Sequence, residues 1–294
     1  MSGELELFSN ETTFNRFAWS PDGSALAATG LGGAYSFRPD GVLFERLSTQ
    51  FDPVWYRDQM ALAYTNVRAD SRLELFSLKD STMRVVSERS LPAAVSWLPD
   101  GESFVFESGN SFYKLNWRHG DETMIQIDPV VSRELPAVSP DGRWLAYSDA
   151  NGIVVAPLEQ RLGSVTSIFG PYTSPCWGPD NSEIAAVNYE LAGITIIKLE
   201  GGKPVDTRDL NEGWNFARPA WSVRHDRVGS RIAAEANGST YVFSGDFDEE
   251  PFRLVNGGTQ LSWSSDAGRI AFVRSGQVYI ADSFTTFTRD LQQK

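Results

Sequence analysis

The chain has 294 residues, a formal net charge of −12 and a pI near 4.7. This excess of negative charge disfavours nucleic-acid backbones and anionic membrane surfaces as partners. The single cysteine, Cys176, excludes an internal disulfide, and no apolar run reaches the roughly 18 residues of a membrane-spanning helix.

A strand–turn–strand pattern begins at residue 17 and returns six more times along the chain. The first copy predicts an inner strand over 15–19, a turn over 20–23, and further strands over 25–29, 34–37 and 42–47. In the turn, Ser, Pro and Gly each suit the backbone conformation of their position. The later copies cover residues 53–65, 95–108, 136–148, 175–188, 219–235 and 261–273.

One bulky residue anchors each copy of the repeat. These anchors are Trp19, Trp55, Trp97, Val138, Trp177, Trp221 and Trp263. Their spacing of about 36–44 residues is the period of a four-stranded propeller blade. We therefore predict an all-β fold, a seven-bladed β-propeller of four-stranded antiparallel blades, with six blades as the alternative. One domain is expected to cover residues 1–294.

The spacing inside each copy predicts how its first two strands pair. In six copies the first large apolar residue of the second strand follows the anchor by seven residues, as Leu26 follows Trp19. The sixth copy is longer, from Trp221 to Ile232, which indicates an extended turn. Proline stands two residues before the anchor in four copies, and proline is poor in a central strand but acceptable on an edge whose N–H side faces a channel. We expect this inner strand to line a central hole.

The two ends of the chain compete for the outer position of the last blade. The alternating segment 4–8 is expected to pair there and close the ring, which leaves no open edge between the first and last repeats. The C-terminal segment 285–291 is the rival for the same position.

The turn sequences carry a family likeness. The stretch Trp19-Ser20-Pro21-Asp22-Gly23 and its equivalents at 97–101 and 138–142 resemble the repeat of TolB-type β-propellers. The resemblance covers all seven copies and implies a propeller. Repeats of this kind occur in the periplasmic TolB protein, in the non-catalytic propellers of prolyl-oligopeptidase-like enzymes and in many stand-alone bacterial proteins, so the resemblance implies no single function. TolB itself has an additional N-terminal domain for which this chain has no room.

The search for catalytic chemistry gives mainly negative results. No G-x-S-x-G nucleophile motif and no phosphate-binding glycine loop before a helix is present. The two histidines, His119 and His225, fall on blades expected to lie nearly opposite each other, so no metal site and no cofactor are predicted. We interpret Cys176 as a small core residue. The repeated aspartates of the turns are interpreted as turn formers.

The start of each inner strand forms the rim of the predicted channel, and polar and aromatic residues gather there. The candidate ligand- or partner-binding residues are Arg16, Asp52, Arg133, Tyr172, Trp214, Asn215, Arg218 and Gln260. The loop 211–218 is rich in the Trp, Phe and Arg types that dominate binding hot spots. The alternative is that Trp214 and Phe216 seal the ends of blades while the arginines pair with Asp52 or Glu134.

Together these observations predict a non-catalytic module that binds a protein or peptide through the channel rim. The alternative is a small-ligand receptor or an enzyme with its site in the mouth of the channel. We expect a protein or peptide partner, no nucleic acid, no membrane insertion and a monomer. The N-terminus has no basic and apolar signal region, so a cytoplasmic location is expected if Met1 is native, and a periplasmic one if a signal was removed.

Overall fold

The computed structural model describes most of the chain between residues 4 and 282. The described residues are 4–6, 14–20, 23–30, 33–37, 43–47, 54–55, 61–66, 72–77, 82–89, 93–100, 102–109, 111–125, 136–159, 164–222, 229–243, 247 and 250–282. Side chains are described through most of five blades, from β10 to β28. In the first two blades the description is largely of the backbone.

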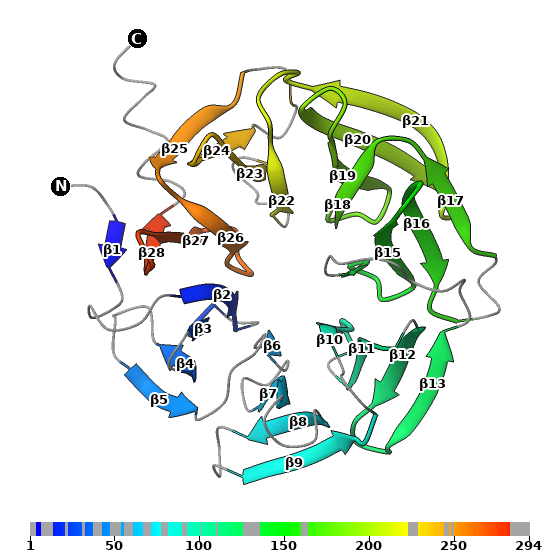
Figure 1. The fold of residues 1–294 in the computed structure, drawn as a ribbon, viewed down its shortest axis with the longest axis vertical. Helices are drawn as coiled ribbons and strands as arrows, with labels where there is room; N and C mark the ends of the chain where they lie inside the picture. The colour runs from blue at the N-terminus through cyan, green and yellow to red at the C-terminus, as the bar shows by residue number, and fades with distance from the viewer. Residues whose placement is uncertain are drawn as a thin grey trace.

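Seven four-stranded antiparallel sheets form a ring, and none of the described segments is helical (Figure 1). The innermost strands touch in succession around the ring, in the order β2, β6, β10, β14, β18, β22, β26 and back to β2. The six-blade alternative is therefore wrong. Each sheet follows chain order from the centre outward, except the last.

The first three blades take their strands directly from the first three repeats. The first comprises β2 (Phe14–Trp19), β3 (Leu26–Gly30), β4 (Gly33–Phe37) and β5 (Leu43–Leu47). The second comprises β6 (Val54–Trp55), β7 (Ala61–Asn66), β8 (Arg72–Ser77) and β9 (Thr82–Ser87). The third comprises β10 (Ala93–Trp97), β11 (Ser103–Ser108), β12 (Ser111–Asn116) and β13 (Asp121–Ile125).

The remaining blades take their strands from the chain in the same order. The fourth comprises β14 (Ala137–Val138), β15 (Trp144–Asp149), β16 (Gly152–Pro157) and β17 (Thr166–Phe169). The fifth comprises β18 (Tyr172–Trp177), β19 (Glu183–Asn188), β20 (Gly193–Glu200) and β21 (Lys203–Leu210). The sixth comprises β22 (Ala217–Trp221), β23 (Ile232–Ala236), β24 (Ser239–Phe243) and β25 (Phe252–Asn256). The seventh comprises β26 (Thr259–Trp263), β27 (Arg269–Arg274) and β28 (Gln277–Asp282), with β1 (Glu4–Glu6) as its outer strand.

The N-terminal strand supplies the outer edge of the seventh sheet. β1 pairs antiparallel with β28, with Leu5 opposite Ile280 (Figure 1). The rival segment 285–291 lies outside the described residues. Because the two ends of the chain share one sheet, the first and last repeats are joined by a ladder of backbone hydrogen bonds.

The predicted pairing of the first two strands is confirmed in every blade. Each anchor lies directly opposite the apolar residue expected from the spacing, as Trp19 lies opposite Leu26 and Trp97 opposite Phe104. The sixth copy keeps this pairing, with Trp221 opposite Ile232, although its turn is longer. Residues 223–228 of that turn lie outside the described part of the chain.

The blades are less regular than the repeat predicts, and proline accounts for part of the difference. β6 and β14 have only two residues each, and each begins directly after a proline, Pro53 or Pro136. Proline has no N–H for the ladder, so pairing begins beyond it. In β18 and β22 the equivalent prolines, Pro175 and Pro219, lie inside the strand at positions where the pairing register shifts.

A β-bulge in the innermost strand was not predicted. It places the residue three before the anchor at positive φ in three successive blades: Ser174 at 52°, Arg218 at 47° and Gln260 at 56°. Non-glycine residues rarely adopt this conformation, and bulges commonly re-aim a side chain near a binding site. Two of these residues, Arg218 and Gln260, belong to the candidate site.

The turn sequence has the structural role that the sequence indicates. The hydroxyl of Ser139 is buried, accepts the backbone N–H of Trp144 at 3.0 Å and donates to Asp141 at 2.6 Å. Ser264 repeats this bond with Asp266 at 2.6 Å. The aspartates accept backbone N–H groups of their own turns, as Asp100 does from Ser103 at 2.8 Å. Their interpretation as turn formers is confirmed.

The apolar core is divided among the spaces between neighbouring blades. Between the fourth and fifth blades, for example, Trp144, Ile153 and Val155 pack against Trp177 and Ile197. Similar clusters lie between the other described blades. Each sheet therefore buries both faces against its neighbours, and the loops at the two ends of the ring remain to form surfaces.

Candidate functional site

The rim face is the face on which the innermost strands begin. Its loops over the fourth to sixth blades are joined by backbone hydrogen bonds: Gly170 donates to Asn151 at 3.0 Å, and Tyr189 to Pro171 at 3.0 Å. Asn215 donates to Ala192 at 2.7 Å. These bonds link the loops 149–152, 169–171, 189–192 and 211–216 into one surface.

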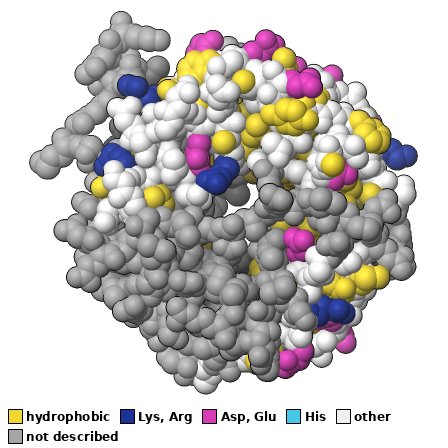
Figure 2. Space-filling view, viewed as in Figure 1, with side chains coloured by type: hydrophobic (Ala, Val, Ile, Leu, Met, Phe, Trp, Pro, Cys, Tyr) yellow, Lys and Arg dark blue, Asp and Glu magenta, His cyan; other side chains and the backbone are white. Residues whose placement is uncertain are grey.

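At the centre of the ring the surface is hollowed, and hydrophobic side chains gather over the part formed by β17 to β22 (Figure 2). Charged side chains of both signs stand beside the hollow (Figure 2). The candidate site is therefore a combination of a polar channel mouth and an apolar area beside it.

The polar part is organised around Glu235 of β23. Its Oε1 accepts the backbone N–H of Gln260 at 2.6 Å, and the same oxygen lies 3.9 Å from Nη1 of Arg218. The glutamate side chain is 12% exposed and the arginine side chain 58% exposed. Glu235 thus ties the bulge of the seventh blade to the second strand of the sixth, and more than half of the Arg218 side chain remains exposed beside it.

Burial raises the pKa of the Glu235 carboxyl, and the Gln260 N–H and the Arg218 guanidinium only partly offset it. The equivalent contact two ring positions earlier, between the fifth and fourth blades, is neutral: Ser174 donates its backbone N–H to the hydroxyl of Ser148 at 3.0 Å. The N–H of the bulge residue is therefore accepted by a carboxylate in one place and by a hydroxyl in the other. This difference makes the mouth near Glu235 the chemically distinctive part of the rim.

The aromatic part of the loop 211–218 is mostly engaged in packing. Trp214 stacks on Phe216 with ring centroids 5.7 Å apart and an interplanar angle of 4°, and it meets Tyr241 edge-on at 5.0 Å. Phe216 is 3% exposed, whereas Trp214 is half-buried. The expectation that these residues seal the end of a blade therefore holds for Phe216. Trp214 keeps part of its surface at the rim.

The other described candidates lie at the same face. Tyr172 begins β18 opposite Asn188 and is half-buried against the core of the fourth and fifth blades. Burial, and to a lesser degree the negative charge of Asp209, raises the pKa of its phenol. Asn215 is exposed, with φ of 54°, and faces solvent beside Trp214.

The side chains of three predicted site residues are not described. Arg16 lies on β2 opposite Thr29, but its side chain is outside the described part of the chain. Asp52 and Arg133 lie wholly outside the described residues, as does Glu134. Among the described residues, Glu235 lies within ion-pair distance of Arg218, and the expected pairing with Asp52 or Glu134 falls outside the described part of the chain.

Two exposed aromatic residues of the rim were missed. Phe169 ends β17 with 76% of its surface exposed, and Tyr189 follows β19 with 63% exposed. Tyr189 stands in a turn and Phe169 at the last position of β17 before a bend. Polar residues are usual at such positions, and that is the signal that could have identified both. Glu235 was missed because its partners lie on another strand and in another blade.

The residues considered for other chemistry have structural surroundings. The half-buried Cys176 accepts the backbone N–H of Trp221 through Sγ at 3.2 Å, and burial raises its pKa to about 11. A thiol with this pKa is a poor nucleophile at neutral pH. His119 is exposed in the turn after β12, and His225 lies outside the described residues.

Within the described part of the chain, no three His, Cys, Asp or Glu side chains are grouped closely enough to hold a metal ion. The described residues also contain no helix with the length and apolar character needed to span a membrane.

Comparisons with known proteins show the fold. No protein-family model and no curated protein matches the sequence. Among solved structures, the chain is similar to a chain of the hydrazine synthase of Kuenenia stuttgartiensis, with a TM-score of 0.72 and 14% identity, over 94% of this chain and 97% of that one. It is also similar to U3-55K, with a TM-score of 0.71 and 10% identity, over 95% of this chain and 98% of that one. At these identities the likeness establishes a β-propeller and leaves the function open.

Proposed function

We propose that the chain is a non-catalytic scaffold that binds a protein or peptide through the rim face. β-Propellers commonly serve as protein-interaction scaffolds, and the repeat resembles that of TolB-type propellers. The observation that carries the proposal is that two exposed aromatic residues, Phe169 and Tyr189, and the largely exposed side chain of Arg218 lie on one face.

The combination fits the composition of binding hot spots. Aromatic side chains and arginine contribute most of the free energy in such interfaces. Aromatic residues that remain 63% and 76% exposed contribute little to folding, and their apolar surface is available for contact with a partner. Trp214, half-buried on a stacked Phe216, adds a rigid apolar surface to the same area.

A selection from a random peptide display library tests this proposal. We expect peptides selected on the parent protein to bind the double variant Phe169→Ser/Tyr189→Ser at least about tenfold more weakly, the loss typical of hot-spot truncation. Val205→Ser is the matched control, because Val205 is 50% exposed on the outer strand β21. Selected peptides that bind the double variant as tightly as the parent would contradict the proposal.

The second candidate is a small-ligand receptor in the channel mouth, favoured by the largely buried carboxylate of Glu235 beside Arg218. A thermal-shift screen against small acids, sugars and metal ions separates the two. A rise in melting temperature with one small ligand, abolished by Glu235→Gln but unaffected by Phe169→Ser/Tyr189→Ser, would favour the receptor.

A further inference from the structure

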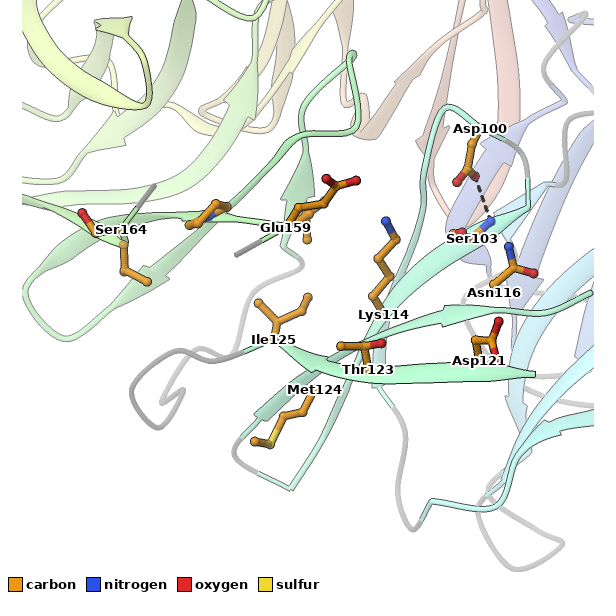
Figure 3. A pocket seen from close by; sticks show the side chains of 13 residues that line it. Asp100, Ser103, Lys114, Asn116, Asp121, Thr123, Met124, Ile125, Glu159 and Ser164 are labelled. Atoms are coloured by element: carbon orange, nitrogen blue, oxygen red, sulfur yellow. Dashed lines mark hydrogen bonds between the residues drawn. The ribbon is translucent and has the colours of Figure 1, made fainter. Parts of the chain in front are cut away.

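A second surface lies between the third and fourth blades, at the opposite end of the blades from the rim. A groove of about 850 Å³ opens there between the outer strands of the third blade and the chain that follows β16 (Figure 3). We define this inter-blade groove by Asp100, Lys114, Asp121, Ile125, Leu158 and Glu159. A smaller hollow of about 290 Å³ shares Asp100, Lys114 and Glu159 with it and extends it to the turn of the fourth blade.

The pairing of β12 with β13 explains why one wall of the groove is polar. Thr123 lies opposite Lys114, and Asp121 opposite Asn116, so all four side chains project from the same face of the sheet, toward the fourth blade. Figure 3 shows Lys114 extending from β12 between Glu159 and Ser103, while Met124 points the other way. Ile125 projects from the same face of the sheet as Asp121 and Thr123, but it is buried.

The apolar core between these blades ends at the floor of the groove. Ile125 and Leu158 belong to the buried cluster shared by the third and fourth blades, and each is 7% exposed. Val165, 39% exposed, and the half-buried Pro157 continue this apolar strip toward solvent. A ligand in the groove therefore meets an apolar strip bordered by charged side chains.

The charges of the groove have an excess of acids. Asp100, Asp121 and Glu159 are exposed, and Lys114 is the cation among them. The extension adds one more acid and one more base, Asp141 and Arg143. A ligand that complements this surface brings positive charge together with apolar side chains.

We propose that the inter-blade groove binds an extended basic peptide segment, in which Lys or Arg alternates with apolar residues. An extended chain puts alternate side chains on opposite sides, so one set can lie on Ile125, Leu158 and Val165 while the other reaches the carboxylates. β13 is the last strand of its sheet, and its outer backbone groups pair with no other described strand. A peptide running along it can add main-chain hydrogen bonds to the side-chain contacts.

The ammonium of Lys114 occupies the space that a ligand's basic side chain would share with the acids. The proposal therefore predicts that removing this side chain strengthens binding of the peptide. Lys114→Met removes a competing cation and is expected to tighten binding of a basic peptide about two- to fivefold, the range of a single partly exposed charge pair. Asp121→Asn combined with Glu159→Gln is expected to weaken it by about fivefold or more, and rising salt to reduce both effects.

Fluorescence anisotropy with a fluorescein-labelled peptide of alternating leucine and arginine tests the inference on the full chain. The control peptides carry Glu for each Arg, or Ser for each Leu, and both are expected to bind at least about tenfold more weakly. The control protein variants are Lys203→Met and Asp206→Asn. Both residues are exposed on β21, the outer strand of the fifth blade, whereas the groove lies between the third and fourth blades. Neither is expected to change the dissociation constant.

A general effect of net charge would give the same two signs, so the β21 controls are what separate the groove from it. Lys203→Met removes one positive charge, as Lys114→Met does, and Asp206→Asn shifts the net charge in the same direction as the acid double variant. No binding of the leucine–arginine peptide near 1 mM, equal binding of the glutamate peptide, or weaker binding by Lys114→Met would each overturn the proposal. Binding that falls only in Phe169→Ser/Tyr189→Ser would overturn it as well, and would assign the peptide to the rim.

Discussion

The indole N–H of Trp19 donates to the backbone carbonyl of Ser262 at 3.1 Å, across 243 residues of sequence. The same bond recurs around the ring: Trp177 donates to Ala137 at 2.9 Å and Trp263 to Ala220 at 3.0 Å. In each case the acceptor is the residue just before the anchor of the preceding blade. At these three positions the tryptophan therefore bonds its own blade to the preceding one, and Trp19 joins the first blade to the seventh.

Replacing these indoles by phenyl rings tests the contribution of the bond. Trp177→Phe is expected to lower the free energy of unfolding by about 1 kcal/mol more than Trp221→Phe, the net value of a typical hydrogen bond. Trp221 is the matched control, because its buried indole nitrogen has no hydrogen-bond partner among the described residues. Urea unfolding of both variants provides the measurement, and equal losses would show that the indole bond contributes nothing.

Removing the N-terminal strand tests how the ring closes. Deletion of residues 1–8 removes β1 and exposes the edge of β28, so we expect a lower melting temperature and concentration-dependent association. Deletion of residues 285–294 is the control and is expected to leave the β1–β28 ladder in place. Light scattering and thermal unfolding measure both effects. If the C-terminal deletion is the more harmful, the outer position of the seventh blade has been assigned to the wrong end.

The period and the pairing of these blades could be predicted because each depends on local sequence. A bulky anchor, a turn with Pro and Gly, and an apolar residue seven positions later define a hairpin within a single repeat, as in the pair Trp19 and Leu26. The anchor's indole bond and the bulge at Gln260 could not be predicted, because their partners, such as Glu235, belong to other blades. Proline does not mark this bulge either, because Leu261 stands two residues before the anchor of the seventh blade.

For the candidate site the limit was similar. The loop 211–218 was found from its composition, but composition does not tell a sealing aromatic residue from an exposed one. Phe216 is buried in a ring stack with Trp214, whereas Phe169 and Tyr189 are exposed and were not among the residues predicted from the sequence. Exposure depends on neighbouring blades, and a single repeat carries no information on it.

Two glycines at positive φ give a matched test of close packing at the rim. Gly152 has φ of 142°, and a Cβ there would lie 2.2 Å from the carbonyl oxygen of Ile168. Gly109 has φ of 62°, and no described atom lies within 4 Å of its Cβ position. Gly109→Ala is expected to cost about 1 kcal/mol through backbone strain alone. Gly152→Ala is expected to cost about 3 kcal/mol or more, since strain and collision add. Similar losses in urea unfolding would contradict the close approach.

The turn of the seventh blade has a carboxylate that stabilises the fold at neutral pH. The Ser264 hydroxyl, with further help from the Gly268 N–H and Arg269, holds the pKa of Asp266 below its usual value. A lowered pKa in the folded state stabilises the protein above the unfolded-state pKa, and this contribution is lost as the pH falls through the folded-state pKa. We expect Asp266→Ala to reduce the melting temperature more at about pH 6 than at about pH 3. A gap that does not narrow in acid would contradict this role.

Glu235 should show the opposite dependence on pH. Burial raises its pKa in the folded protein, so folding favours the protonated carboxyl. The stability associated with this shift is fully present below the unfolded-state pKa of about 4.3 and is lost as the pH rises through the folded-state pKa. Glutamine at this position does not titrate and can still accept the Gln260 N–H. The free energy of unfolding of Glu235→Gln, relative to the parent, is therefore expected to increase from about pH 4 to about pH 7, as measured by urea unfolding. A relative stability that stays constant or falls over this range would mean that Arg218 and the Gln260 N–H compensate the buried charge fully.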